Sequence, residues 1–173
     1  IGRAIIDLHW RADLLNEAEH GPDSSSVLVT PSAALLAAVQ GELEEQIAAL
    51  PTPRDEYARL ALHNGGAVLV DSMEEGAEVA NAYAPEHLEL QIADARPEEF
   101  VHAGAIFVGP HTPVSLGDYL AGSNHVLPTG GQARFQPGLS AATFLRPQQV
   151  IEYDRTALAT VRDGIVALAE AEA

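Results

Sequence analysis

The 173-residue sequence contains no cysteine, so it forms no disulfide and offers no thiolate to a metal. Any metal site must therefore use imidazole, carboxylate or amide groups. Basic residues are also scarce, since nine Lys and Arg stand against 25 Asp and Glu and give a formal net charge of −16. This excess of negative charge argues against a nucleic-acid partner, because the phosphate backbone would be repelled. No apolar run approaches the roughly 18 residues of a membrane span, so we expect no membrane segment.

The chain does contain an alternation of short apolar runs and amphipathic segments. Buried strands are predicted at SSVLVT (25–30), GAVLVDS (66–72) and AIFVG (105–109). Helices are predicted over 10–20, 31–50, 54–64 and 73–82, the second with Pro31 in its first turn. This order favours an α/β fold whose strands form one parallel sheet with right-handed crossovers. We expect the three strands to be neighbours in an incomplete Rossmann-like domain.

The C-terminal part of the chain has a different character. From Pro137 on, it holds a short run, QVIEYD, and then an Ala-rich amphipathic helix over 155–173. We therefore expect an α/β domain over 1–136 and a small C-terminal helical unit over 137–173. The helix reaches Ala173 without a Gly or Pro cap, and the chain begins with Ile rather than Met. Both features are expected of a piece of a longer protein.

A polar loop follows the predicted strand over 105–109. Glycines and prolines turn and stiffen it, and hydrogen-bonding side chains lie between them: Asp118, Tyr119, Asn124, His125 and Thr129. A polar loop at the end of a buried strand is where α/β folds place ligands. The alternative is a solvated surface loop.

Two pairs of residues could carry chemistry. Glu86 and His87 follow Pro85, and on an extended segment neighbouring side chains point to opposite sides. One could then handle a water molecule and the other a substrate proton; the alternative is a surface pair at the end of a helix. Glu17 and His20 lie three residues apart, on one face of a predicted helix.

The Glu-x-x-His spacing can direct two ligands at one metal ion. Adding Asp118 to Glu17 and His20 gives an oxygen, nitrogen and oxygen set that suits zinc. The alternative is that Glu17 and His20 belong to a solvated helix end.

Three segments, EAEHGPDSSSVLVT, NAYAPEHLEL and GDYLAGSNHVLPTGGQAR, resemble those of the histidinol dehydrogenase family in order and spacing. The resemblance covers essentially the whole chain but only the C-terminal half of the family's sequence. It implies that the rest of this α/β domain and a nucleotide-binding domain precede it in the family. The chain has no GxGxxG motif, so no cofactor-binding residue is assigned to it.

The resemblance implies catalytic and substrate-binding roles. Glu86 would activate water, and His87 would relay substrate protons. Glu172 matches a glutamate that contacts the substrate from the C-terminal segment. In the family this segment reaches into the partner subunit's site, so a homodimer is implied. His125 is interpreted as structural, and Val114, where the family usually has Glu, is given no chemical role.

The resemblance also implies a zinc site. His20 and Asp118 match two zinc ligands, and Glu17 falls where the family has a glutamine ligand, which adds a negative charge to the metal shell. All three would also lie against the substrate. The family's remaining ligand, a histidine five residues beyond the position of Glu172, would fall after Ala173.

The implied activity is the last step of histidine biosynthesis. A cytoplasmic enzyme of this kind oxidises L-histidinol to L-histidine through the aldehyde, using Zn²⁺ and two molecules of NAD for a four-electron oxidation. One alternative is a related zinc-dependent dehydrogenase of another polar alcohol, which Glu17 favours. The other alternative is an inactive remnant that binds metal or dimerises.

Overall fold

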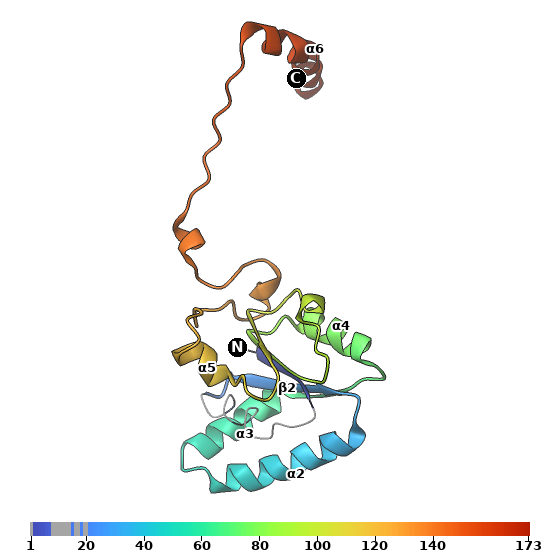
Figure 1. The fold of residues 1–173 in the computed structure, drawn as a ribbon, viewed down its shortest axis with the longest axis vertical. Helices are drawn as coiled ribbons and strands as arrows, with labels where there is room; N and C mark the ends of the chain where they lie inside the picture. Colours follow the sequence, from blue (N-terminus) through green and yellow to red (C-terminus); the bar gives the residue numbers. More distant parts are fainter. Residues whose placement is uncertain (1, 8–14, 16–17, 19–20) are drawn as a thin grey trace. The chain divides into compact units, whose positions relative to one another are not determined.

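A computed structural model of the chain describes residues 2–7, 15, 18 and 21–173, and Figure 1 shows the arrangement of its elements. Within these residues, five strands form one parallel sheet in the order β3-β2-β1-β4-β5. The strands are β1 (Gly2–Asp7), β2 (Ser25–Thr30), β3 (Gly66–Leu69), β4 (His87–Gln91) and β5 (Ala105–Val108). The chain first adds β2 and β3 on one side of β1, and then adds β4 and β5 on the other. The predicted α/β class with a parallel sheet is confirmed.

Two strands were missed by the sequence analysis. β2 and β3 are neighbours as expected, but β1 and β4 lie between β2 and β5, so the three predicted strands are not all adjacent. β4 reads HLELQ and is buried at all five positions. Strands of a parallel sheet normally read as continuous apolar runs, because both faces are covered. The polar residues in β4 interrupt that pattern, so the sequence indicates only an extended segment here.

The described helices are α2 (Ala33–Ala49), α3 (Arg54–Asn64), α4 (Met73–Tyr83), α5 (Val114–Tyr119) and α6 (Arg155–Glu172), with short 3₁₀ turns η1 (Pro97–Glu99), η2 (Gln132–Arg134) and η3 (Ala141–Phe144). The helix predicted over 10–20 lies outside the described residues, except for Leu15 and Ala18, which are helical and buried. α2 begins two residues later than predicted. Ser32 is its N-cap and accepts a hydrogen bond from the Leu35 amide at 3.1 Å, so Pro31 precedes the helix.

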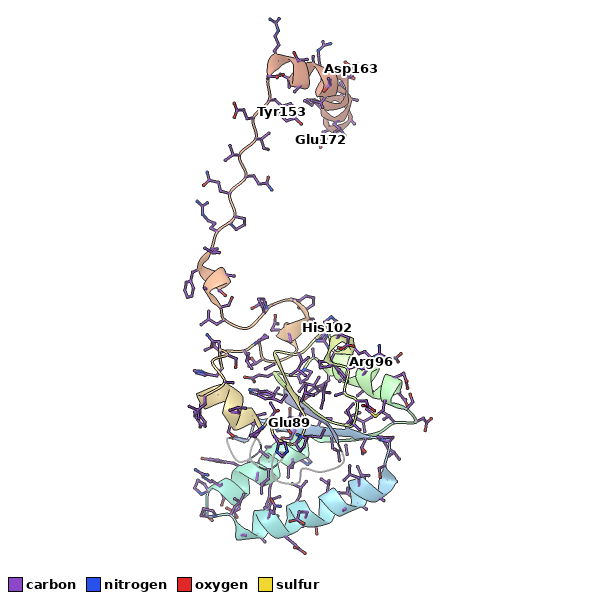
Figure 2. The ribbon with its side chains drawn as sticks, in the orientation of Figure 1. Glu89, Arg96, His102, Tyr153, Asp163 and Glu172 are labelled. Atoms are coloured by element: carbon purple, nitrogen blue, oxygen red, sulfur yellow. The ribbon has the colours of Figure 1, made fainter. Side chains whose placement is uncertain are left out.

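The two faces of the sheet carry different cores. α4 covers one face through the cluster Val29, Val70, Ala77, Ala80, Leu88, Leu90 and Phe100. α2 covers the other face, where Val39 packs on Leu28. Because side chains alternate along a strand, His87, Glu89 and Gln91 lie on the face opposite to Leu88 and Leu90. The buried polar side chains of β4 therefore lie on the face of the sheet that α2 covers. One of them, Glu89, is labelled in Figure 2.

The chain divides into two compact units, Ile1–Ser140 and Ala141–Ala173. The second unit holds η3 and α6 and has no buried residue. The predicted roles of 1–136 as the catalytic part and 137–173 as a dimerisation segment stay predictions. No helix in the described ranges is long and apolar enough to cross a bilayer.

The junction between α3 and β3 gives a test of the fold. Gly65 ends α3, and a Cβ placed on it would lie 2.1 Å from the Ser26 carbonyl oxygen, whereas a Cβ on Gly66 would meet nothing within 4 Å. We predict that Gly65→Ala lowers the free energy of unfolding by about 1–3 kcal/mol, because β2 must move away. Urea denaturation of the chain measures this change. Gly66→Ala is the matched control, with a change below about 0.5 kcal/mol; equal losses in both variants would contradict the packing of α3 against β2.

Candidate functional site

The site begins at the corner between α4 and β4. Only three residues, 84–86, connect the two elements. Ala84 caps α4 in a left-handed conformation, with φ 54°, and its amide donates to the Ala80 carbonyl at 2.9 Å. Ala84 and Pro85 are almost completely buried. Because this connector is short and enclosed, the end of α4 determines where Glu86 and His87 lie.

β5 holds the same connector from the other side. The Gly104 amide donates to the Pro85 carbonyl, and the Ala105 amide donates to the Glu86 carbonyl, both at 2.9 Å. A Cβ on Gly104 would lie 2.6 Å from the Glu86 carbonyl oxygen, so this close approach requires glycine. The parallel pairing then continues with His87 opposite Ala105.

α5 brings an acidic side chain to His87. The imidazole ring is buried and lies 5.9 Å from the ring of Phe107, measured between centroids. Gly117 lets α5 pack on that ring, since a Cβ there would be 2.6 Å from it. Asp118, the next residue, places one carboxylate oxygen 3.9 Å from the His87 Nε2 atom. This distance is longer than a hydrogen bond but short enough for an ion pair when the imidazole is protonated.

The loop after α5 does not stay at the carboxyl end of β5, where the sequence analysis placed it. The Ser123 hydroxyl donates a hydrogen bond to the Gly117 carbonyl at 3.3 Å. Further along the loop, Pro128 lies next to Gly104, the residue before β5. Glu86, His87 and Asp118 thus gather at the amino ends of β4 and β5. The physical reason is the packing of α5 on Phe107, which turns the chain back along β5.

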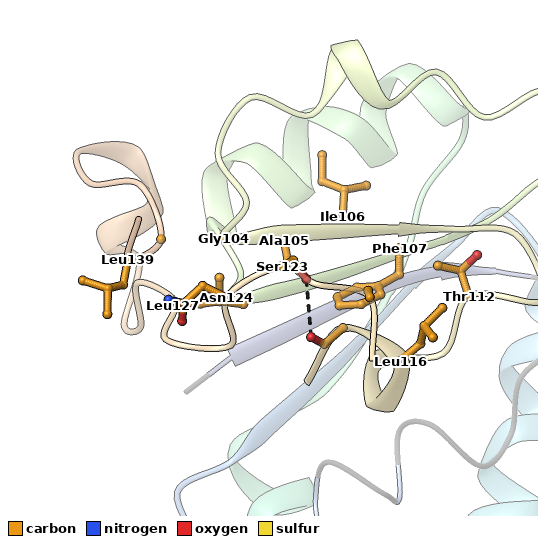
Figure 3. Close-up of a pocket in the computed structure, with 13 residues that line it drawn as sticks. Gly104, Ala105, Ile106, Phe107, Thr112, Leu116, Ser123, Asn124, Leu127 and Leu139 are labelled. Carbon is orange, nitrogen blue, oxygen red and sulfur yellow. Dashed lines mark hydrogen bonds between the residues drawn. The ribbon is translucent and has the colours of Figure 1, made fainter. Parts of the chain in front are cut away.

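A cavity of about 440 Å³ lies beside β5 and α5 (Figure 3). Its lining includes Phe107, Leu116, Ser123, Asn124, Leu127 and Leu139. The Asn124 side-chain oxygen accepts a hydrogen bond from the Val126 amide at 2.7 Å, and the Ser123 hydroxyl is bonded as described above. The Ser123 and Asn124 side chains therefore hydrogen-bond to the protein backbone. The rest of the cavity wall is mostly apolar.

The structure brings together three of the predicted site residues. Glu86 is half-buried, His87 is buried, and the Asp118 side chain is 36% exposed. Glu17 and His20 lie outside the described residues. Glu172 is the last residue of α6 in the second unit, where it is exposed. Among the residues that the structure describes, no group of three His, Cys, Asp or Glu is placed to hold a metal ion.

Sequence reasoning missed two polar groups near this corner. Glu89 is fully buried on β4 and lies on the same face as His87, two residues away. The signal for it was the alternation of polar residues in HLELQ. Arg134 donates hydrogen bonds to the carbonyl oxygens of Ala82 and Gly131. No local pattern indicated that a loop arginine would reach the end of α4.

The contact at Gly104 gives a test of how Glu86 is positioned. We predict that Gly104→Ala separates β5 from the connector, because its Cβ would collide with the Glu86 carbonyl oxygen. The Ala105 amide would then exchange its hydrogen faster, by about tenfold or more, which corresponds to about 1.4 kcal/mol of local opening. Amide exchange by NMR measures this rate. Gly41→Ala, where a Cβ meets nothing within 4 Å, is the control, and unchanged exchange in Gly104→Ala would refute the contact.

Known proteins resemble this chain in sequence and in fold. The family described as histidinol dehydrogenase matches residues 8–173. Histidinol dehydrogenase of Leifsonia xyli is 57% identical over 163 residues, which are 93% of this chain and 37% of that protein. The Thermobifida fusca protein is 54% identical, with the same coverage. The crystal structure of histidinol dehydrogenase from Elizabethkingia anophelis is similar with a TM-score of 0.83 and 34% identity, over 99% of this chain and 41% of that one.

The chain thus spans little more than a third of the length of these curated relatives. Within that length, the match includes the corner at Glu86 and His87, the helix α5 that carries Asp118 and the α6 segment. The agreement in sequence extends over more than nine-tenths of the chain, and the agreement in fold over nearly all of it. The chain therefore belongs to the histidinol dehydrogenase family.

Proposed function

We propose that this chain is the part of a cytoplasmic histidinol dehydrogenase that carries the acid/base pair Glu86 and His87. The whole enzyme would oxidise L-histidinol to L-histidine with NAD, through the aldehyde. The observation that carries this proposal is the corner at β4. There a buried imidazole and a half-buried carboxylate are adjacent in sequence and fixed by β5, and a second carboxylate lies 3.9 Å from the imidazole.

Each oxidation step needs a base. When the alcohol becomes the aldehyde, its hydroxyl proton must leave as the hydride leaves the carbon, and His87 accepts that proton. His87 gives it up to the aldehyde oxygen when water adds to the carbonyl carbon, and is then neutral again. Glu86, on the other side of the chain, takes a proton from the water that adds to the aldehyde. The resulting hydrate gives up a second hydride and passes a hydroxyl proton to the neutral His87, leaving the carboxylic acid, while Glu86 releases the proton of the water to solvent. The hydride acceptor in both oxidations would be NAD, which supplies the redox chemistry when bound.

The proposed zinc ligands in this chain are Glu17, His20 and Asp118. Asp118 fits the role, because it is a partly exposed carboxylate beside His87. Gly21, which follows His20 in the sequence, begins the turn that enters β2 at the amino end of the sheet, the same end as His87. Zinc bound there would orient the imidazole and amine of the substrate. The alcohol group of the substrate would then lie beside Glu86 and His87.

The proposal includes a homodimer in which Glu172 contacts the substrate. The second unit supports it, because the apolar side chains of this unit are exposed: Leu145, Val150, Ile151, Leu158, Ile165 and Leu168. So much exposed apolar surface in a short segment is expected to be covered by another protein surface.

The first test uses a hybrid enzyme, in which this chain replaces the 163 matching residues of the Leifsonia xyli protein. We expect the hybrid to reduce NAD when L-histidinol is added. Glu86→Gln and His87→Asn should each lower kcat by about 10²- to 10⁴-fold, as is typical of a removed acid or base. Both should retain zinc, because neither residue is proposed as a ligand.

His63→Asn is the matched control, because His63 is exposed in the last turn of α3. It should keep the kcat of the parent. Oxidation of another polar alcohol in preference to L-histidinol would favour the related dehydrogenase. A folded hybrid that binds zinc and oxidises neither would favour an inactive remnant. Full activity in Glu86→Gln and His87→Asn would refute the assigned roles.

The second test concerns the zinc ligands of the hybrid. Asp118→Asn should weaken zinc binding by at least tenfold, because an amide oxygen is a weaker ligand for a divalent cation than a carboxylate. For the same reason Glu17→Gln should not bind zinc more tightly than the parent. Competition with a chelator measures both affinities. Asp163→Asn, on a fully exposed side chain of α6, is the control. Tighter binding by Glu17→Gln, or unchanged binding by Asp118→Asn, would remove these residues from the site.

A further inference from the structure

The side chain of Arg134 joins the last turn of α4 to the loop after α5. Its Nη2 atom donates a hydrogen bond to the Ala82 carbonyl, and its Nη1 atom donates to the Gly131 carbonyl at 3.2 Å. Ala82 and Arg134 are 52 positions apart in the sequence. The guanidinium group therefore makes a long-range link between a helix end and a loop.

The chemistry of this contact suits an arginine. The last carbonyls of a helix have no partner within the helix and form the negative end of its dipole. α4 has no basic residue of its own in the last turn. The guanidinium supplies a positive charge and several donors in a fixed fork, so it can satisfy carbonyls on two segments at once.

The loop is shaped to admit this side chain. Gly131 has φ 77° and is the N-cap residue of η2, which ends at Arg134. A Cβ on Gly131 would lie 2.6 Å from the Arg134 Nη1 atom and 3.9 Å from the Tyr83 carbonyl oxygen. Glycine at this position thus provides both the left-handed turn and the space for the guanidinium against α4.

The contact is close to the proposed acid/base pair along the chain. Ala82 precedes Glu86 by four residues, and the intervening Ala84 and Pro85 are buried, so the connector has little room to adapt. A shift in the last turn of α4 would be passed on to Glu86 and His87. A displacement of about 1 Å at a reacting group can cost about 10²-fold in rate.

The same loop reaches the connector at a second point and also leads to Asp118. Pro128 lies 3.2 Å from the position that a Cβ would take on Gly104, whose amide is bonded to Pro85. Towards its start, the loop is joined to α5 by the hydrogen bond from Ser123 to the Gly117 carbonyl. The segment that holds Asp118 and the helix that leads to His87 are therefore linked through Arg134.

We propose that Arg134 is a positioning residue for the acid/base pair. Its guanidinium holds the last turn of α4 against the loop, and this fixes Glu86 and His87 relative to Asp118. Arg134 itself touches neither substrate nor cofactor in this account. The proposal rests on the function proposed above for Glu86 and His87.

The test compares three variants of the hybrid enzyme. Arg134→Met keeps the aliphatic stem and removes every donor, and Arg134→Lys keeps the charge but cannot bridge both carbonyls. Arg96→Met is the control, because Arg96 is an exposed arginine paired with Glu99 at 3.0 Å (Figure 2). We expect Arg134→Met to lower kcat by about 10- to 100-fold with a smaller change in KM. Arg134→Lys should recover part of that loss, and Arg96→Met should match the parent.

A second readout does not depend on turnover. In the isolated chain, Arg134→Met should speed hydrogen exchange at the amides of Ala84 and Ala105, which bond to Ala80 and Glu86, while Arg96→Met should not. Unchanged exchange at both amides would overturn the proposal even if the hybrid were inactive. Parent-like kcat in Arg134→Met would also overturn it. The proposal would also be overturned if the fall in kcat only followed a fall in the free energy of unfolding, measured in urea, and Arg134→Lys did not recover kcat.

Failure of the function proposed above looks different. In that case the parent hybrid itself would not oxidise L-histidinol, whereas the exchange rates at Ala84 and Ala105 would still respond to Arg134→Met.

Discussion

Two backbone hydrogen bonds from the start of β5 to the connector before β4 determine the geometry of the site. They bring the Gly104 and Ala105 amides to the carbonyls of Pro85 and Glu86. Because backbone donors and acceptors in a buried corner must be paired, this arrangement leaves the connector almost no alternative conformation. The exposure of the Glu86 and His87 side chains follows from this backbone arrangement. Glu86 is left half-buried at the corner, while the next residue enters the sheet and is enclosed.

The position of the site at the amino ends of the strands follows from a second constraint. In open α/β sheets ligands commonly bind at the carboxyl ends, where the strand order reverses. Here the absence of a side chain at Gly117 lets α5 pack on Phe107 and carry Asp118 back along β5 to His87. The proposed acid/base pair and the proposed zinc ligand Asp118 therefore come from segments about thirty residues apart. In our proposal, the hydrogen bonds of Arg134 to the Ala82 and Gly131 carbonyls hold these segments together.

Much of the fold could be predicted from the sequence because its signals are local. α2, α3 and α4 have apolar periodicity and clear end signals, and β2 and β5 are short apolar runs. β4 was missed because His87 and Glu89 interrupt the apolar pattern, although the strand is buried on both faces. Glu86 and His87 could be named as candidates from their adjacency after Pro85, and the family resemblance implied their roles. The links through Gly117 and Arg134 could not, because they depend on tertiary packing between segments distant in the sequence.

We propose that Glu86, His87 and Asp118 form one site at the amino ends of β4 and β5. The most direct measurement is a crystal structure of the hybrid enzyme with zinc and L-histidinol. Our account predicts zinc bound by Asp118 together with Glu17 and His20. It also predicts that the imidazole of His87 lies within hydrogen-bonding distance of the substrate hydroxyl. Substrate bound at the carboxyl ends of the strands, or zinc bound without Asp118, would contradict it.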